Sequence, residues 1–192
     1  DHESPSISVK FPLPGAGQAL PSLSGKNVSI VIWTTTPWTL VSNLAVALHP
    51  QFDYVAVDIG NNEVLIVAEA LLAQSLQKFG ITEHRVLEKF KGKKLEGLKA
   101  RHPFIDRESL VILGEHVTLE AGTGVVHTAP GHGQEDYEAG LRYGLDVYAP
   151  VDHKARFTKE AGVFIGEHVH KANKGVINLR QEKGVLLASE KL

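Results

Sequence analysis

The chain has 192 residues, 43% of them hydrophobic, and its formal net charge is −2 with the histidines neutral. This length and apolar content suffice for one domain with a sizeable core and exclude a disordered chain. The absence of cysteine excludes disulfides, thiol catalysis and thiolate metal sites, and it fits a cytoplasmic protein. So small a net charge gives no overall attraction for nucleic acid, and we expect any such contact to be local.

The sequence shows no membrane-spanning or targeting signal. No apolar run approaches the ~20 residues that cross a bilayer, and no basic segment followed by an apolar one opens the chain. Methionine is absent even from position 1, so we expect a fragment or a processed chain.

Most of the predicted elements are strands. Residues 6–11 alternate apolar and polar side chains, and residues 28–32 are rich in β-branched residues, so both segments are predicted to be strands. Residues 12–25 are rich in Pro, Gly and Ser and are predicted to form a loop. Further strands are predicted at residues 44–48, 54–59, 63–68, 85–90, 110–113, 117–119, 125–128, 147–151 and 185–188.

Three helices are predicted between these strands. The apolar spacing indicates helices at 69–79 and 134–143, each followed by a glycine. Asn173 suits the N-terminal cap of a third helix that extends to Lys183, whereas the basic residues 91–101 receive no assignment. Because strands and helices do not alternate strictly, a mixed α+β fold with a β-barrel-like core and peripheral helices is favoured over a doubly wound sheet.

A threonine-rich segment follows the strand at 28–32. It reads Trp33-Thr34-Thr35-Thr36-Pro37-Trp38-Thr39, and Asn43 comes four residues later. Proline cannot donate a ladder hydrogen bond, so we expect Pro37 to stop the strand and three hydroxyls to lie at its rigid end. The alternative is that these threonines are present only because threonine packs well in strands.

A second polar segment runs from Gly124 to Tyr137 and is predicted to form a strand, a turn and a helix. His127 lies in the strand, His132 in the Gly-rich turn, and Asp136 in the first helical turn. Polar groups from a strand end and a helix start therefore converge, which is a common way to build a site on a rigid scaffold.

Four interpretations of this second segment remain open on the residues alone. His127, His132 and Asp136 are suitable zinc ligands, although their spacing matches no zinc pattern. The turn and helix start suit a phosphate, although Glu135 and Asp136 would repel it. Asp136 is also favoured beside a helix N-terminus with no further role. In the fourth interpretation Asp136 binds a cation such as an α-ammonium group, threonine hydroxyls hold an ester, ribose or water, and His127 lines the side-chain wall.

At these two motifs the sequence resembles the editing domain of isoleucyl-tRNA synthetases of the bacterial type. The similarity covers the segment from Trp33 to Asn43, Gly122-Thr123-Gly124, the segment from Gly131 to Tyr137, and Gln181-Glu182-Lys183-Gly184. The order and separation of the motifs also match over essentially the whole chain. Thr36 stands where the related valine and leucine enzymes typically carry arginine, and Val41 stands where many relatives carry proline.

The resemblance implies a single editing domain over residues 1–192, inserted in the catalytic domain of a longer synthetase. Its implied activity is hydrolysis of valine wrongly attached to the isoleucine tRNA, and editing of valyl-adenylate is left open. The implied partners are the 3′ end of that tRNA and the rest of the parent synthetase, without any membrane. The signatures His-Ile-Gly-His and Lys-Met-Ser-Lys-Ser are absent, so ATP and Mg²⁺ are assigned to the parent's catalytic domain, and no cofactor or metal is expected here.

The resemblance implies catalytic roles for four residues. Asp136 anchors the substrate ammonium, whereas Thr35 and Thr36 contact the ester, the terminal adenosine and the attacking water. Asn43 supports the threonine segment or takes part in catalysis. No residue is an obvious general base, so we expect positioning of the water and of the ester to supply most of the catalysis.

Five further residues are expected to bind the substrate. Thr39 and His127 line the side-chain pocket and exclude isoleucine, and Thr34 joins the other threonine hydroxyls. Trp33 packs beside the pocket, and His132 either contacts the substrate or holds the turn.

Two other functions remain open: an aminoacyl or adenylate binding module that is inactive without the parent enzyme, and a free-standing metallohydrolase. The lysines at positions 89, 91, 93 and 94 either contact tRNA phosphates or form a solvated surface run.

Overall fold

The computed structural model describes residues 5–145 and 186–191, and the strands of this part form two sheets. The larger sheet has the order β10-β1-β2-β5-β4-β6, and the smaller has the order β7-β8-β3-β9. The larger sheet comprises β1 (Pro5–Pro12), β2 (Asn27–Thr34), β4 (Asp53–Gly60), β5 (Glu63–Ala68), β6 (Arg85–Lys91) and β10 (Leu186–Lys191). The smaller comprises β3 (Ala45–Leu48), β7 (Lys99–Arg101), β8 (Glu108–Leu113) and β9 (Val125–Thr128). The pairs β2–β5 and β3–β8 are parallel.

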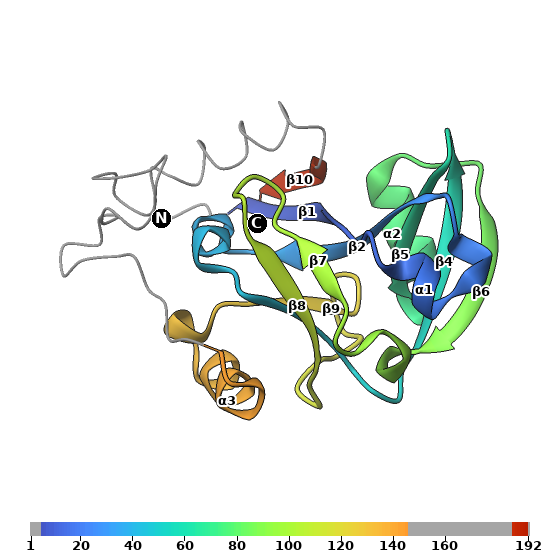
Figure 1. Cartoon of the computed structure of the whole chain (residues 1–192). Coiled ribbons are helices and arrows are strands. Elements are labelled where there is room, and N and C mark those ends of the chain that lie inside the picture. Colours follow the sequence, from blue (N-terminus) through green and yellow to red (C-terminus); the bar gives the residue numbers. More distant parts are fainter. Residues whose placement is uncertain (1–4, 146–185, 192) are drawn as a thin grey trace.

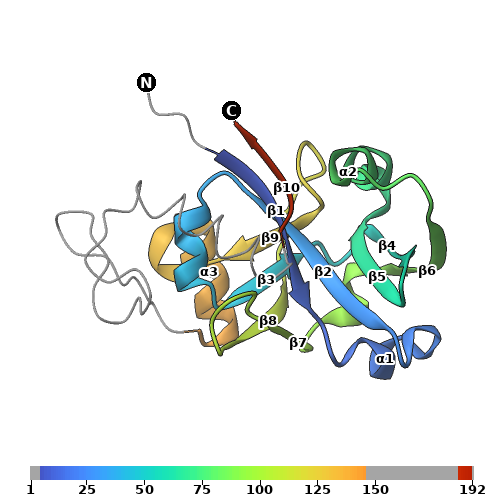
Figure 2. The same ribbon diagram turned by 90° about the horizontal axis from the view of Figure 1, so that it is seen from above.

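Two helices of more than one turn lie at opposite ends of the described part (Figures 1 and 2). Helix α2 (Leu72–Phe79) lies beside β4 and β5, whereas α3 (Gln134–Tyr143) lies beyond the smaller sheet. Each helix ends at a glycine in the left-handed region, Gly80 with φ 70° and Gly144 with φ 67°. Glycine adopts this conformation without steric cost, so the sequence itself terminates both helices.

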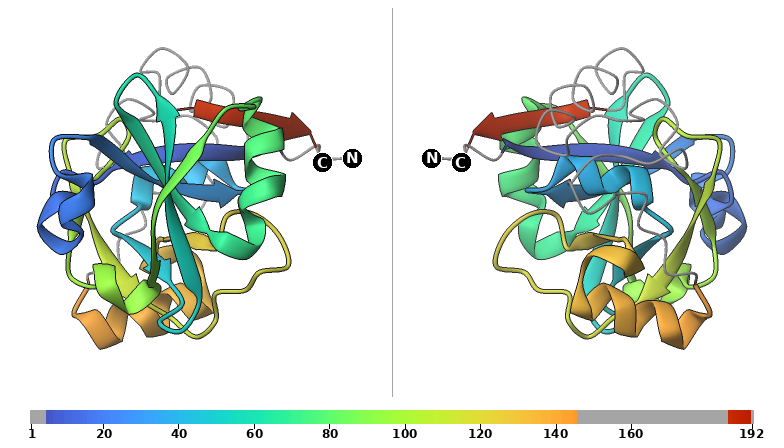
Figure 3. Two further views of the ribbon diagram at one scale, coloured as in Figure 1. Left: turned by 90° about the vertical axis from the view of Figure 1, so that its right-hand side faces the viewer. Right: turned by 90° about the vertical axis from the view of Figure 1, so that its left-hand side faces the viewer.

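Strand β2 is one of the two central strands of the larger sheet. Ile30 and Ile32 pack in the main core between the two sheets, whereas Val31 packs on the opposite face beneath α2. All three side chains are fully buried, which explains why this strand is apolar without alternation. Figure 3 shows β1 and β10, the first and last described strands, side by side at one edge of this sheet.

The predicted mixed fold is confirmed, with its strands in two sheets rather than one closed barrel among the described residues. The predicted strands at 6–11, 28–32, 44–48, 54–59, 63–68, 85–90, 110–113 and 125–128 are present, and Leu186–Lys191 extends past the strand predicted to end at residue 188. The helix predicted over 69–79 is a 3₁₀ turn, Glu69–Leu71, followed by α2. The helix at 134–143 is present as predicted.

Two predictions about local structure are wrong or incomplete, and the structure fills in one segment that has no sequence assignment. Residues 117–119 form no strand, because Val117 is buried by packing in a turn and not by pairing in a sheet. The loop predicted at 12–25 contains α1 (Ala16–Ala19) and a 3₁₀ turn. The unassigned segment 91–101 contains a 3₁₀ turn and the short strand β7. The strand at 147–151, the helix from Asn173 to Lys183 and the motif at 181–184 lie outside the described residues.

Candidate functional site

A cavity of about 380 Å³ lies where β2 ends, between the following 3₁₀ turn (Pro37–Ser42), β9 and the start of α3. Of the predicted site residues, all except Asn43 line it: Trp33, Thr34, Thr35, Thr36, Thr39, His127, His132 and Asp136. The two sequence motifs therefore meet in space, although about 90 residues separate them along the chain.

The threonines take different positions around the strand end. β2 ends at Thr34, and Pro37 begins the 3₁₀ turn, so the strand stops slightly before the proline. The Thr34 hydroxyl accepts the backbone N–H of Thr36 at 3.1 Å and lies 3.3 Å from the Thr36 hydroxyl. Thr35 is half-buried and Thr36 is exposed, so the segment offers hydroxyls at the cavity surface from a loop that its own side chains stabilise.

His127 and Thr39 form a buried pair in the cavity wall. The distance from His127 Nε2 to Thr39 Oγ1 is 2.8 Å, and the Thr39 hydroxyl donates to the carbonyl oxygen of Thr36 at 2.8 Å. Both side chains are 7% exposed. Their hydrogen bonds restrict rotation, so this part of the wall has a defined shape.

Asn43 lies behind this wall and does not line the cavity. Its side chain is fully buried, with Nδ2 2.8 Å from His127 Nδ1. Arg107 donates to the backbone oxygen of Asn43 at 3.1 Å and to that of Val41 at 2.8 Å. The structure therefore places Asn43 behind His127 and outside the lining of the cavity.

Asp136 lies at the cavity edge in the first turn of α3. Its Oδ2 accepts the backbone N–H of Ala129 at 3.0 Å, which fixes the carboxylate across the turn. Burial raises the pKa of Asp136, and the Ala129 hydrogen bond opposes this rise. The structure records no hydrogen bond to Oδ1 from residues 5–145 or 186–191, so this oxygen can accept a cationic donor.

The raised pKa predicts an acid limb in the activity of this site. A carboxyl whose pKa is raised takes up its proton at a higher pH than an ordinary aspartate, and only the carboxylate attracts an ammonium group. We expect kcat/KM to fall as the pH decreases through this pKa. An ammonium group bound there would stabilise the carboxylate, so kcat should fall only at a lower pH. Deacylation profiles over pH test this, and an acid limb that persists unchanged in Asp136→Asn would contradict it.

His132 combines a structural contact with a place at the cavity. Its Nε2 lies 2.8 Å from the Ser42 hydroxyl, and its ring packs edge-on against Trp38 with the ring centroids 5.0 Å apart. Burial lowers the pKa of His132, which favours the neutral ring at pH 7. The turn is thus held to the 3₁₀ segment, and a neutral His132 adds no charge to the cavity lining.

The loop between β8 and β9 forms one side of the cavity, and the sequence motifs single out only its Gly122-Thr123-Gly124 segment. His116, Thr118 and Glu120 from this loop line it, as does Glu135 from α3. The Nε2 atom of His116 is buried without a hydrogen-bond partner among the described residues. No periodicity or spacing in the sequence indicates that these residues line the cavity, because their positions depend on how the loop packs against the rest of the domain.

The Gly122-Thr123-Gly124 motif joins this loop to the larger sheet. The Thr123 hydroxyl donates to the carbonyl oxygen of Val31 at 2.6 Å, and the Thr123 carbonyl accepts the N–H of Ala68 at 2.8 Å. Gly124 has φ +80°, and a Cβ there would lie 2.4 Å from the Cβ of Ala68. Glycine is therefore required both for the backbone conformation and for the close approach of the chains.

Gly124→Ala should destabilise the domain by about 2–5 kcal/mol, the sum of a left-handed alanine and an overpacked core. Gly80→Ala is the matched control, because Gly80 has φ +70° with nothing within 4 Å of its Cβ position. The control should lose only about 1–2 kcal/mol, the backbone contribution alone. Urea denaturation of both variants measures the difference, and equal losses would show that the contact with Ala68 is unimportant.

The zinc interpretation finds no geometric basis in the described part. Within residues 5–145 and 186–191, no three His, Cys, Asp or Glu side chains are grouped to hold a metal ion. His127 contacts Asn43 and Thr39, whereas His132 contacts Ser42. The two rings are therefore engaged by separate partners.

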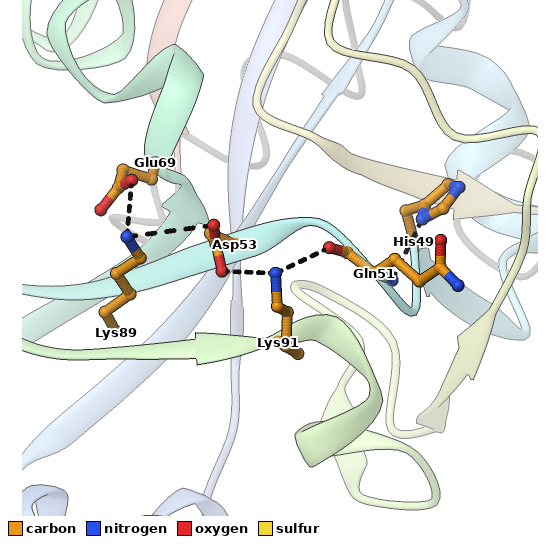
Figure 4. A network of polar contacts seen from close by, with 6 residues as sticks. All are labelled: His49, Gln51, Asp53, Glu69, Lys89 and Lys91. Atoms are coloured by element: carbon orange, nitrogen blue, oxygen red, sulfur yellow. Dashed lines mark hydrogen bonds and ion pairs between the residues drawn. The ribbon is translucent and has the colours of Figure 1, made fainter.

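Two of the four surface lysines are paired within the protein (Figure 4). Lys89 lies 3.2 Å from Glu69 and 3.9 Å from Asp53, and Lys91 lies 3.0 Å from Asp53. The hydrogen bond to Lys91 lowers the pKa of Asp53, and the hydrogen bond to Glu69 raises the pKa of Lys89. These carboxylates offset the positive charge, which favours the interpretation of a solvated surface run.

The fold is similar to solved structures of leucyl-tRNA synthetase editing domains. The crystal structure of GlLeuRS-CP1 matches with a TM-score of 0.76 at 17% identity, covering 97% of this chain and 100% of that chain. The editing domain of the P. falciparum cytosolic leucyl-tRNA synthetase matches with a TM-score of 0.75 at 11% identity, covering 96% and 99%. The fold is therefore that of a synthetase editing domain.

The sequence model of the family described as "Leucyl-tRNA synthetase, editing domain" matches residues 15–186, and the chain belongs to this family. The chain is 50% identical over 192 residues to the isoleucine–tRNA ligase of Petrotoga mobilis and 52% identical over 194 residues to that of Nitratidesulfovibrio vulgaris. Both matches cover 100% of this chain but only 20% and 21% of the ligases, so the chain spans about a fifth of their length. The predicted resemblance to the editing domain of isoleucyl-tRNA synthetases is confirmed.

In the described part of the chain, no helix is long and apolar enough to cross a membrane.

Proposed function

We propose that this domain hydrolyses the ester of valine attached to the isoleucine tRNA and spares the isoleucine ester. The single observation that carries the proposal is the cavity that joins Asp136 to the Thr39–His127 wall. It combines a carboxylate for the ammonium of an aminoacyl group with a rigid wall for its side chain. The family membership and the likeness to isoleucine–tRNA ligases support this choice of substrate.

The need for a second sieve follows from the size of one methylene group. Isoleucine has one more methylene than valine, and a binding pocket gains only about 1–3 kcal/mol of binding free energy from one methylene. This range is established for an isoleucine enzyme and does not come from the present structure. A second site that excludes the larger amino acid discriminates more strongly, because forcing an extra methylene into a close-packed pocket costs free energy.

The mechanism relies on positioning. Asp136 binds the ammonium, and the hydroxyls of Thr35 and Thr36 orient the ester, the terminal ribose and the attacking water. Backbone N–H groups stabilise the oxyanion, and a neighbouring ribose hydroxyl assists the proton transfer. No cofactor or metal enters this scheme, and ATP with Mg²⁺ serves the catalytic domain of the parent enzyme.

The proposed partners are the 3′ end of the isoleucine tRNA carrying valine, and the rest of the parent synthetase, in the cytoplasm. Valyl-adenylate would present the same ammonium and side chain to the cavity. We therefore propose it as a second substrate, which a hydrolysis assay without tRNA tests directly.

A single-turnover assay with Val-tRNA and a strong chelator tests the proposal. The 192-residue chain should release valine rapidly, and the chelator should have no effect. Loss of activity with the chelator would instead support a metallohydrolase. Binding of a non-hydrolysable valyl-adenosine analogue without any hydrolysis would support the alternative of a binding module that needs the parent enzyme.

A further inference from the structure

A chain of buried hydrogen bonds runs behind the cavity wall across three neighbouring segments of the smaller sheet. Ser109 on β8 donates to Asn43 Oδ1 at 2.6 Å, and Asn43 Nδ2 lies 2.8 Å from Nδ1 of His127 on β9. Between them, Asn43 lies two residues before the start of β3, which pairs with both β8 and β9. Ser109 and Asn43 are fully buried and do not line the cavity.

The orientation of the Asn43 amide is fixed by its other partners. Nδ2 donates to the carbonyl oxygen of Ala45 at 2.9 Å, and a carbonyl oxygen can only accept. A flipped amide would place its oxygen against the Ala45 oxygen and lose the hydroxyl donor of Ser109. The amide nitrogen therefore faces His127.

This orientation determines the tautomer of His127. The amide nitrogen can only donate a hydrogen bond. Nδ1 of His127, 2.8 Å away, must therefore accept it and carries no proton. In the neutral ring the proton then lies on Nε2, which points to Thr39 Oγ1 at 2.8 Å. Thr39 accepts from the ring and donates its own proton to the Thr36 carbonyl oxygen at 2.8 Å.

We infer that Ser109 and Asn43 are positioning residues for specificity: they hold His127 as the Nε2–H tautomer and thereby fix the Thr39–His127 wall. Every hydrogen bond from Ser109 to Thr36 then runs in one direction, so no link can reverse without disturbing its neighbours. The role of this wall in excluding isoleucine rests on the proposed function, whereas the tautomer assignment does not.

The tautomer is measured by ¹⁵N–¹H NMR of the histidine rings in the 192-residue chain labelled with ¹⁵N-histidine. His127→Gln identifies the signals of this ring among the 10 histidines. The wild-type ring should show a protonated Nε2 and an unprotonated Nδ1. A protonated Nδ1 in the neutral wild-type ring would overturn the inference, whatever the rates of hydrolysis.

Two substitutions alter the hydrogen bonds while retaining the backbone. Asn43→Asp replaces the donor by an acceptor of the same shape, so it removes the hydrogen bond to the Ala45 oxygen and Nδ1 of His127 should become protonated. Ser109→Ala removes the donor to Oδ1, so a smaller population should change tautomer. Ser75→Ala is the matched control, since Ser75 is also buried but its hydroxyl has no partner among the described residues. It should leave the His127 signals unchanged.

Specificity is measured as the ratio of kcat/KM for Val-tRNA to kcat/KM for Ile-tRNA. We expect Asn43→Asp to lower this ratio by about 10-fold, within the range of 10–200-fold for one methylene, and Ser75→Ala to preserve it. A tautomer change with an unaltered ratio would overturn the role in specificity. If the wild type hydrolyses neither ester, the proposed function fails. The wall is then tested by the ratio of the affinities for valyl- and isoleucyl-adenosine analogues. This ratio must fall in Asn43→Asp.

Discussion

Asp136→Asn should lower kcat/KM for Val-tRNA by about 30–5,000-fold, the largest loss expected from any single substitution at this site. The variant removes the negative charge that binds the substrate ammonium, and losing one partner of a desolvated charge pair costs about 2–5 kcal/mol. The asparagine oxygen can still accept the Ala129 N–H that Asp136 accepts at 3.0 Å. Deacylation kinetics with pre-charged Val-tRNA measure the loss.

The control for this prediction is Glu138→Gln on the same helix. Glu138 is exposed and does not line the cavity. Both variants remove one negative charge from α3, so any general change in attraction for tRNA appears in both. Burial raises the pKa of Asp136, which means that the folded state disfavours its carboxylate, and the neutral amide should not unfold the domain. A wild-type rate in Asp136→Asn would exclude the ammonium clamp.

Thr39→Ser should increase hydrolysis of Ile-tRNA by about 10–200-fold, the second large effect expected at this site. The substitution removes one methyl group from the wall but keeps the hydroxyl that lies 2.8 Å from His127 Nε2. The additional space should accommodate the extra methylene of isoleucine. Hydrolysis of Val-tRNA should change little, because valine already fits.

Thr39→Val separates volume from hydrogen bonding. Valine has the same branched shape as threonine but cannot accept the hydrogen bond from His127 Nε2, so this variant should reject isoleucine better than Thr39→Ser but less well than the wild type. Single-turnover rates with both esters give the comparison. If Thr39→Ser still spares Ile-tRNA, Thr39 is not the residue that excludes the extra methylene of isoleucine. His127→Ala, which opens the wall further, is then the next variant to measure.

The sequence predicts the site well where strands end in polar turns. The threonine segment after β2 and the segment from His127 to Asp136 both follow buried strands, and strand ends fix the direction of the chain. Their convergence could not be derived from spacing, since it depends on how the two sheets pack. The resemblance to a known family supplied that step.

The misses have a common physical origin in tertiary packing. Val117 is apolar because it is buried under α3 and the smaller sheet, which local patterns cannot distinguish from a strand. The three-residue strand β7 is too short to alternate. His116 reaches the cavity from a loop, and Asn43 is directed behind His127 by Ser109 and Ala45. Each position depends on contacts between distant segments.

The central claim is that one cavity hydrolyses the valine ester and rejects the isoleucine ester. The most direct measurement is a competition in which Val-tRNA and Ile-tRNA, labelled with different isotopes, react with this chain in one tube. We predict loss of the valine label at a rate at least 10-fold above that of the isoleucine label, the lower limit for one methylene. Equal rates of loss would contradict the account, because they would show hydrolysis without a sieve.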